Sequence, residues 1–279
     1  MACYCLAVAL CFACRCCENR IVTVKRIALG VEYDGSPFSG WQSQPDAPNV
    51  QDTLQAALSS IAGEPVSVLA AGRTDTGVHA LEQMVHFDTE IERPLTAWVR
   101  GTNALLPESI AVLWAHPVPE EFHARFSAQA RSYRYILINR PSRLAVHHGK
   151  AGWFHAPLDV DKMREAAAYL LGEHDFSAFR SSECQAKTPV KNLAQLDITR
   201  QGDTIIFELT ANAFLHHMVR NIVGCLVYIG KGKHPPLWVK DVLESRNRNR
   251  AAPTFAPDGL YLRRVAYAAK WGLPQVCAQ

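Results

Sequence analysis

The stretch AAGRTDTGVHALEQMVHFDT, residues 70–89, decides how this chain is organised. Gly72 and Gly77 bracket four polar residues, and glycine allows the backbone to turn sharply between them. Residues 65–71 (PVSVLAA) are apolar and rich in β-branched side chains, and residues 81–87 continue the chain after the turn. Extended runs on both sides of a short polar turn predict two β-strands. The turn therefore presents its charged side chains from a rigid connection.

Arg73 and Asp75 are the charged residues of this turn. A neighbouring guanidinium favours the ionised form of a carboxylate, and an ionised carboxylate on a rigid scaffold can act as a nucleophile. In the structural alternative, Asp75 accepts hydrogen bonds from local amides and Arg73 is solvated. A second arginine, Arg220, favours the functional interpretation. It lies in the largely apolar run AFLHHMVRNIVG, residues 213–224, and a buried cation requires an anionic partner. Asp75, a phosphate or another acidic residue could supply that anion.

The order of predicted elements indicates an α+β fold made of two similar halves. The first half reads β-α-β-β-α-β, with strands at 25–35, 65–71, 81–87 and 109–118, a helix from 50 to 62 and a helix within 94–107. Asn49 and Gly63 are the expected caps of the first helix.

The second half repeats this order with variations. It predicts strands at 132–139, 193–200, 204–211 and 259–267, with helices at 159–179, 214–230 and 235–246. We expect two pseudo-symmetric, ferredoxin-like halves, residues 21–125 and 126–279, joined into a mainly antiparallel sheet. Helices on one side of it would leave a central active-site cleft where the halves meet.

Composition and charge are those of an ordinary globular protein. Of 279 residues, 48% are hydrophobic and 20% are charged, and 29 Lys and Arg stand against 26 Asp and Glu. The basic residues are clustered, mainly within 123–143 and 246–264, and such clusters fit a polyanionic ligand. No apolar run after residue 20 approaches the roughly 20 residues of a membrane span, which predicts a cytoplasmic protein.

The first twenty residues differ in character from the rest. Six of the nine cysteines lie there, and the spacing lacks the second ligand pair of a zinc finger. We interpret residues 1–20 as a disordered leader, or as sequence ahead of the natural start, and leave them out of the functional argument.

Five strings of the sequence together resemble the tRNA pseudouridine synthase A family. They are GRTDTGVHA at 72–80, FHARFSA at 122–128, ARSYRYILIN at 130–139, NAFLHHMVRNIVG at 212–224 and GLYLRRVAY at 259–267. The resemblance covers residues 24–267. It implies an isomerase that converts uridine to pseudouridine at positions 38, 39 and 40 in the anticodon stem-loop of tRNA. It also implies a homodimer that uses no cofactor and no metal.

The resemblance assigns roles to five residues of this chain. Asp75 takes the place of the catalytic aspartate, Arg73 that of the motif arginine and Arg220 that of the arginine in the second half. Tyr133 takes the place of the active-site tyrosine, and Leu260 that of the apolar residue lining the base pocket. Substrate binding would involve Arg73, Tyr133 and Leu260.

One neighbour of the aspartate departs from the family pattern. Thr76 stands where bacterial members most often have alanine, and because threonine is small we expect tuning of activity instead of its loss.

The chemistry of isomerisation fits a single carboxylate. The bond from C1′ to N1 must break and a bond from C1′ to C5 must form, without redox change or hydrolysis. Asp75 could attack C1′, attack C6 of the base, or take a proton from the ribose to give a glycal, and the sequence leaves these routes open. A glycosidase would use two carboxylates. The remaining alternatives are a base-excising hydrolase and an RNA-binding module without activity.

The substrate must leave its stack to reach Asp75, and the sequence suggests what assists it. Tyr133 is suited to stack on the flipped base, whereas its ordinary pKa of about 10 makes it a poor base. Basic clusters would hold the RNA backbone by charge and shape, so affinity should fall with salt.

The histidines do not predict a metal site. His147 and His148 are adjacent, as are His216 and His217, whereas two helical ligands need a spacing near four residues. We assign no catalytic role to His79 or His217 and expect structural or RNA-facing histidines.

Overall fold

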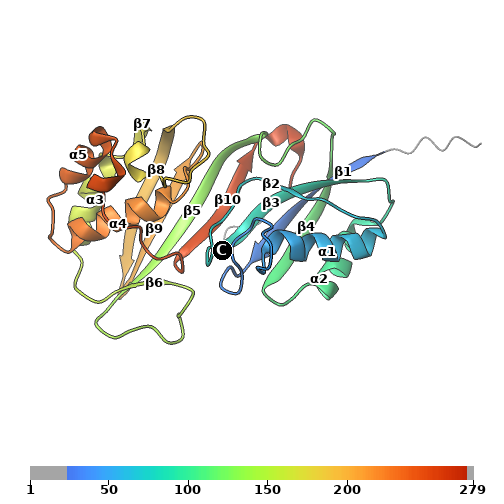
Figure 1. Cartoon of the computed structure of the whole chain (residues 1–279), viewed down its shortest axis with the longest axis horizontal. Coiled ribbons are helices and arrows are strands. Elements are labelled where there is room, and N and C mark those ends of the chain that lie inside the picture. Colours follow the sequence, from blue (N-terminus) through green and yellow to red (C-terminus); the bar gives the residue numbers. More distant parts are fainter. Residues whose placement is uncertain (1–23, 275–279) are drawn as a thin grey trace, which may run out of the picture.

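One ten-stranded sheet forms the body of the computed structural model, which describes residues 24–274 (Figure 1). The predicted leader at 1–20 lies outside the described residues. The strands of the first half are β1 (Lys25–Tyr33), β2 (Leu69–Ala70), β3 (His79–Thr89) and β4 (Ile110–Val118). Those of the second half are β5 (Ala128–Asn139), β6 (Gly152–Phe154), β7 (Gly172–Asp175), β8 (Val190–Gln201), β9 (Thr204–Ala211) and β10 (Leu260–Tyr267).

The two halves join along a short seam in the middle of the sheet. The strand order is β4-β1-β3-β10-β5-β9-β8-β7, with β2 beside β3 and β6 beside β5. At the seam β3 and β10 run parallel and pair through only two residue pairs, Tyr261 with His79 and Leu262 with Ala80. All the other pairs along this order are antiparallel. The predicted α+β fold with a mainly antiparallel sheet is confirmed.

The first half follows the predicted order of elements. Helix α1 (Val50–Ala62) begins after Asn49, whose side chain accepts a hydrogen bond from the backbone N–H of Asp52, and it ends at Gly63. The second helix is a π-helical turn, η1 (Ala97–Gly101), that continues into α2 (Thr102–Leu105).

The strand before the turn is shorter than the predicted 65–71. The N–H groups of Val66 and Val68 donate to Ser59 Oγ (2.9 Å) and Gln55 Oε1 (3.0 Å) of α1, so this backbone does not join the sheet.

All three helices of the second half are also shorter than predicted. Helix α3 (Val160–Ala168) is capped by Asp159 as expected, but the predicted extension to 179 is wrong. The helix ends at Ala168, and four residues later Gly172, with a φ of 97°, begins β7, which pairs with β8. Helix α4 (Met218–Gly230) begins four residues later than predicted, because His217 has a φ of 62° and cannot lie within a right-handed helix. The last helix, α5, spans Trp238–Ser245.

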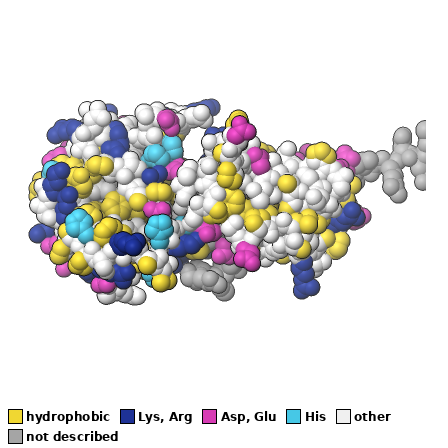
Figure 2. All heavy atoms as spheres, turned by 60° about the horizontal axis from the view of Figure 1, so that its bottom comes forward, with side chains coloured by type: hydrophobic (Ala, Val, Ile, Leu, Met, Phe, Trp, Pro, Cys, Tyr) yellow, Lys and Arg dark blue, Asp and Glu magenta, His cyan; other side chains and the backbone are white. Residues whose placement is uncertain are grey.

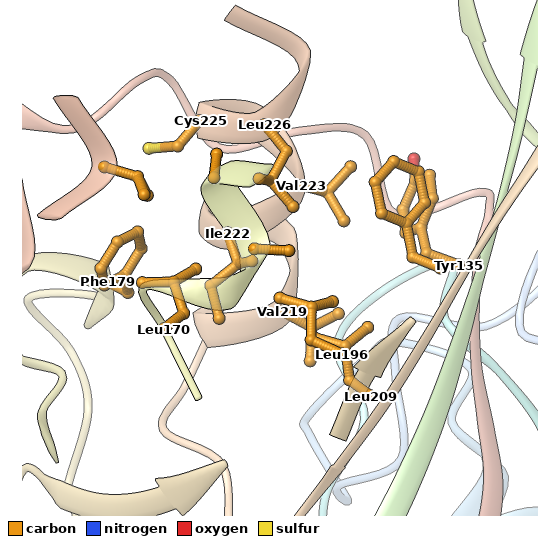
Figure 3. Close-up of a cluster of buried hydrophobic side chains, with 14 of the residues drawn as sticks. Tyr135, Leu170, Phe179, Leu196, Leu209, Val219, Ile222, Val223, Cys225 and Leu226 are labelled. Carbon is orange, nitrogen blue, oxygen red and sulfur yellow. The ribbon is translucent and has the colours of Figure 1, made fainter. Parts of the chain in front are cut away.

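Each half has its own hydrophobic core. In the second half α4 is almost wholly buried, and Figure 3 shows Ile222, Val223 and Leu226 of this helix among side chains of the sheet and of neighbouring segments. In the first half the core includes Leu54 and Leu58 of α1. Burial of α4 on several sides fixes the position of its N-terminal end, which lies near the seam. Within residues 24–274 no helix has the length and apolar character needed to cross a membrane.

The buried histidine of β3 should make stability depend on pH. His86 is 1% exposed and its Nδ1 accepts a hydrogen bond from the N–H of Ala124 at 3.2 Å. Burial lowers the pKa of His86 from 6.5 to about 4. The unfolded chain therefore takes up this proton at higher pH than the folded chain, so the stabilisation is complete above pH 6.5 and is lost towards pH 4.

We expect the melting temperature to fall by several degrees between pH 6.5 and pH 4, since ~1 kcal/mol corresponds to about 2–4 °C for a chain of this size. The variant His86→Gln keeps a hydrogen-bond acceptor and should show a flatter pH dependence, measured by thermal unfolding. His148→Gln, at an exposed position, is the matched control. Equal slopes for the wild type and His86→Gln would contradict this account of His86.

Candidate active site

The turn between β2 and β3 is held from several sides. Tyr33 and Thr74 share a buried hydrogen bond between their hydroxyl groups at 2.8 Å, and the N–H of Trp41 donates to the carbonyl of Thr74 at 3.0 Å. Gln83 Nε2 donates to the carbonyl of Gly72 at 2.7 Å. The predicted rigid presentation of this turn is therefore visible in its contacts.

A close approach of two backbones requires glycine next to this turn. Gly40 has a φ of 100°, and a Cβ at this position would lie 2.8 Å from the carbonyl oxygen of Thr74. The segment after β1 can pack against the turn because residue 40 has no side chain.

Asp75 and Arg220 form an ion pair that joins the two halves. Arg220 Nη1 lies 3.0 Å from Asp75 Oδ2, and Arg220 Nε donates to the carbonyl of Phe255 at 2.8 Å. The side chains of Arg220 and Asp75 are 14% and 22% exposed. The anion expected for Arg220 is thus the carboxylate of Asp75. The residues that bind this carboxylate lie at the N-terminal end of α4, where the helix dipole also favours a negative charge.

Two histidines complete the contacts of the carboxylate. His216 Nε2 lies 3.1 Å from Asp75 Oδ1, and His217 Nε2 lies 3.3 Å from Asp75 Oδ2. Their ring centroids are 4.0 Å apart. The left-handed backbone of His217 places both imidazoles on the same side, which two adjacent residues inside a helix could not achieve. In the sequence, the only indication of this arrangement is that two polar residues, His216 and His217, interrupt an apolar run.

The imidazole of His217 favours its neutral form. Burial lowers its pKa from the ordinary value, and the nearby charges of His216 and Arg220 act in the same direction, while the charge of Asp75 acts against them. A neutral imidazole donates a hydrogen bond to the carboxylate without neutralising it. The imidazole of His217 therefore adds no positive charge beside Asp75 and Arg220.

The same three residues form a group of possible metal ligands. The candidate ligand atoms of Asp75, His216 and His217 all lie within 4.8 Å of one another. The spacing argument against a metal is therefore wrong for this pair, because it assumed helical geometry. Arg220 is 3.0 Å from the same carboxylate and repels any cation that would enter. On this ground we retain the prediction that the site uses no metal.

Arg73 lies apart from this cluster. Its side chain is exposed, and it makes no hydrogen bond or ion pair with another described residue. The expectation that Arg73 contacts the aspartate is wrong for this structure, because Arg220 occupies that place. The guanidinium of Arg73 is consequently available to a ligand.

Tyr133 and Leu260 lie on neighbouring strands next to the seam. Tyr133 on β5 packs edge-on against Phe214, with ring centroids 5.0 Å apart. Burial, together with the charge of Asp75, raises the pKa of Tyr133 to about 12, so the phenol keeps its proton at neutral pH. Leu260 is 5% exposed and is the first residue of β10, one position before Tyr261 of the seam.

His79 is a structural residue. It is 2% exposed, its Nδ1 accepts from the N–H of Gly35 at 3.1 Å, and its Nε2 lies 3.2 Å from the carbonyl of Asp258. Its ring stacks on Tyr261 with centroids 4.6 Å apart. Because both ring nitrogens have partners, the structural interpretation of His79 is confirmed.

Comparison with known protein families finds a match over most of the described chain. A family model described as tRNA pseudouridine synthase matches residues 30–127 and 166–268. The first stretch contains Asp75 and the second contains Arg220, while Tyr133 lies between them.

Curated relatives agree with the family model. The chain is 61% identical over 251 residues to tRNA pseudouridine synthase A of Paraburkholderia xenovorans, covering 90% of this chain and 93% of that protein. It is 58% identical over 249 residues to the protein of the same name from Dechloromonas aromatica, covering 89% of this chain and 95% of that one. A chain of the solved H/ACA RNP bound to a substrate RNA containing 2′-deoxyuridine is 10% identical and matches with a TM-score of 0.36 over 72% of this chain and 43% of that chain.

The contact between His217 and the carboxylate can be tested by titration. In Asp75→Asn the isosteric amide removes the charge that raises the pKa of His217, while burial still lowers it. We expect the imidazole of His217 to titrate at lower pH in this variant than in the wild type, measured by NMR of the ring protons. His234, whose ring packs between Tyr228 and Trp238, serves as the internal reference and should not move. An unchanged or raised pKa for His217 would rule out the charge interaction.

Proposed function

Because the chain belongs to the tRNA pseudouridine synthase family, we propose that it acts at positions 38, 39 and 40 of the anticodon stem-loop, with Asp75 as its nucleophile. Membership makes the chain an isomerase that forms pseudouridine in tRNA. The positions modified in tRNA and the identity of the nucleophile need experimental tests.

The assignment of Asp75 as the nucleophile rests on the contacts of its carboxylate. Every ionic partner of Asp75 is a basic side chain, namely Arg220, His216 and His217. Among residues 24–274, no second carboxylate forms an ion pair with Arg220, His216 or His217, whereas a glycosidase needs two carboxylates at a set separation. A single charged oxygen at a partly exposed position suits attack on the target nucleotide without hydrolysis.

The reaction requires a proton transfer as well as the exchange of the C1′–N1 bond for a C1′–C5 bond. The C1′–N1 bond breaks, C1′ joins C5, the proton on C5 leaves, and N1 gains a proton, so atoms balance without a cofactor. The phenol of Tyr133, with its pKa raised to about 12, does not accept the C5 proton at neutral pH. We assign Tyr133 to stacking on the extruded base, with Leu260 behind it.

In this scheme Arg73 contacts the RNA and takes part in extruding the base. Its guanidinium is exposed two residues before Asp75 and forms no ion pair with any residue of 24–274. Taking a nucleotide out of its stack costs a few kcal/mol, and a cation that contacts the opened strand offsets part of that cost. Arg73 therefore belongs to substrate binding, and Arg220 holds the nucleophile.

The assembly and location of the enzyme follow from the family resemblance. We propose a homodimer that works in the cytoplasm, with one tRNA contacting both subunits. Sedimentation equilibrium of the purified chain tests the homodimer, since a monomer would show half the mass of a dimer.

One assay separates the proposed synthase from its two alternatives. A tRNA transcript labelled with tritium at C5 of uridine should release tritium without free uracil, and mapping should place pseudouridine at positions 38, 39 and 40. Free uracil would indicate a hydrolase, and binding without release would indicate a module that only binds RNA. Pseudouridine at other positions would reject the proposed site.

The nucleophile is tested by the isosteric variant Asp75→Asn. We expect turnover to be abolished while tRNA binding stays within about tenfold, or roughly 1.4 kcal/mol. Asp203→Asn, in the exposed turn between β8 and β9, is the matched control and should keep turnover. Residual turnover by Asp75→Asn combined with a large loss of binding would exclude Asp75 as the nucleophile.

A further inference from the structure

We propose that Arg131 is a positioning residue of the proposed reaction. Its guanidinium holds the turn that carries Asp75 and the segment that leads to His216 and Arg220 in the placement that the reaction requires. This role rests on the proposed function, in which Asp75 is the nucleophile, and extends it to a side chain that does not contact the carboxylate. The hydrogen bonds of Arg131 to three backbone carbonyls are the observation behind it.

The guanidinium of Arg131 is bonded to three separate segments of the chain. Nη2 donates to the carbonyls of Ala71 at 3.2 Å and Arg125 at 3.0 Å, and Nη1 donates to the carbonyl of Asn212 at 3.0 Å. Ala71 follows β2, Arg125 precedes β5, and Asn212 follows β9. One side chain therefore fixes the distances between three pieces of backbone that are far apart in the sequence.

Two of these carbonyls lie just ahead of the residues of the candidate active site. Ala71 opens the stretch 71–75 that ends at Asp75, and Asn212 opens the stretch 212–216 that ends at His216. His216 Nε2 is 3.1 Å from Asp75 Oδ1, so the two stretches meet at the carboxylate. Because both stretches are short, a shift of either carbonyl would move the carboxylate relative to its basic partners.

Arg131 lies on the same strand as Tyr133 and on the same face of it. Both residues belong to β5, which lies between β10 and β9 in the sheet (Figure 1), and residues two apart in a strand point to one side. Tyr133 packs against Phe214, and Arg131 bonds the carbonyl of Asn212. One face of β5 therefore holds the segment between β9 and α4 at two points.

A guanidinium is suited to this task by its shape. It presents five N–H groups in a fixed planar fork, so it can hold several acceptors at set angles, whereas the ammonium group of lysine is a single point charge. Within residues 24–274 no carboxylate forms an ion pair with Arg131. Its half-buried charge is therefore compensated by carbonyl oxygens, which it holds in return.

These contacts give Arg131 a different task from the one expected for the basic cluster at 123–143. Exposed Lys and Arg side chains, which lie mainly over the second half on the face drawn in Figure 2, are available to a polyanion. Arg131 is half-buried, and both of its terminal nitrogens already donate to carbonyls of the protein. It is therefore suited to holding backbone in place and not to holding an RNA phosphate.

The narrow seam between the halves explains why such a bridge matters. Strands β3 and β10 share only two residue pairs, so few backbone hydrogen bonds fix one half against the other. The ion pair of Asp75 with Arg220 also crosses the seam, but it uses the oxygens that must react. The bonds of Arg131 do not involve the carboxylate. They would keep the two halves in register while Asp75 reacts with the nucleotide.

The first test compares the rate of reaction with binding. In Arg131→Lys the charge remains but the fork is lost. With enzyme in excess over tRNA, we expect pseudouridine formation to slow about hundredfold, the cost of misplacing reacting groups by about 1 Å. The Kd for tRNA should stay within about threefold. An unchanged rate, or a loss of binding that accounts for the loss of rate, would overturn the proposal.

The matched control makes the same substitution at another carbonyl-bound guanidinium. Arg164 of α3 donates from Nε to the carbonyl of Ile198 at 2.8 Å, away from the candidate active site. Arg164→Lys should react like the wild type. Thermal unfolding checks that both variants are folded at the assay temperature. Equal slowing of the two variants would assign the effect to general stability and overturn the positioning role.

A second variant separates a contact to protein from a contact to RNA. Arg131→Gln removes the charge. If Arg131 bound a phosphate, the slope of log Kd against log salt concentration would fall by about 0.7–0.9 in this variant. We expect the slope of the wild type together with a slowed reaction. A reduced slope would make Arg131 an RNA contact and overturn the proposal.

A crystal structure of Arg131→Lys tests the placement directly and does not depend on activity. We expect Arg220 Nη1 and Asp75 Oδ2, 3.0 Å apart in the wild type, to lie beyond the roughly 3.5 Å limit of a hydrogen bond. An unchanged contact would overturn the proposal. If Arg131→Lys did not fold, Arg131→Gln would replace it. If the wild type formed no pseudouridine, the proposed function would fail, and this comparison would still decide whether Arg131 places Asp75.

Discussion

The ion pair between Asp75 and Arg220 is the interaction on which the site depends. It joins a turn of the first half to a helix of the second half, across a seam where β3 and β10 share only two residue pairs. Removing either partner would leave an uncompensated charge in a partly buried place, which is costly. The pair therefore sets where the two halves meet as well as where the carboxylate lies.

The frame around this ion pair is rigid on both sides. On one side Tyr33, Trp41 and Gln83 hold the turn, and on the other the buried helix α4 holds Arg220. The positive φ of His217 is a backbone conformation that few residues other than glycine adopt, and it lies next to the proposed nucleophile. That conformation directs the imidazoles of His216 and His217 onto the carboxylate of Asp75. It therefore contributes to the geometry of the site, although it interrupts the helix.

The basic side chains of the second half are unevenly distributed. Near the carboxylate, one guanidinium and two imidazoles contact Asp75. Farther along the second half, Arg180, Arg246 and Arg248 line one surface groove, and none of its lining residues is acidic. Because charge is local in this way, the formal net charge of the whole chain, only +3, says little about what the protein binds.

Sequence patterns determined the α+β class, the order of elements in the first half and the caps Asn49 and Asp159, because capping and strand patterns are local. They also selected Asp75 and Arg220, since a cation in an apolar run requires an anion. The ends of α3 and α4, the two imidazoles on Asp75 and the distance of Arg73 from it were decided only by the tertiary structure. Each of these depends on a backbone angle, such as the φ of 62° at His217, or on packing between segments far apart in the chain. Local propensity does not encode such contacts, because it records what a segment prefers and not which segment it meets.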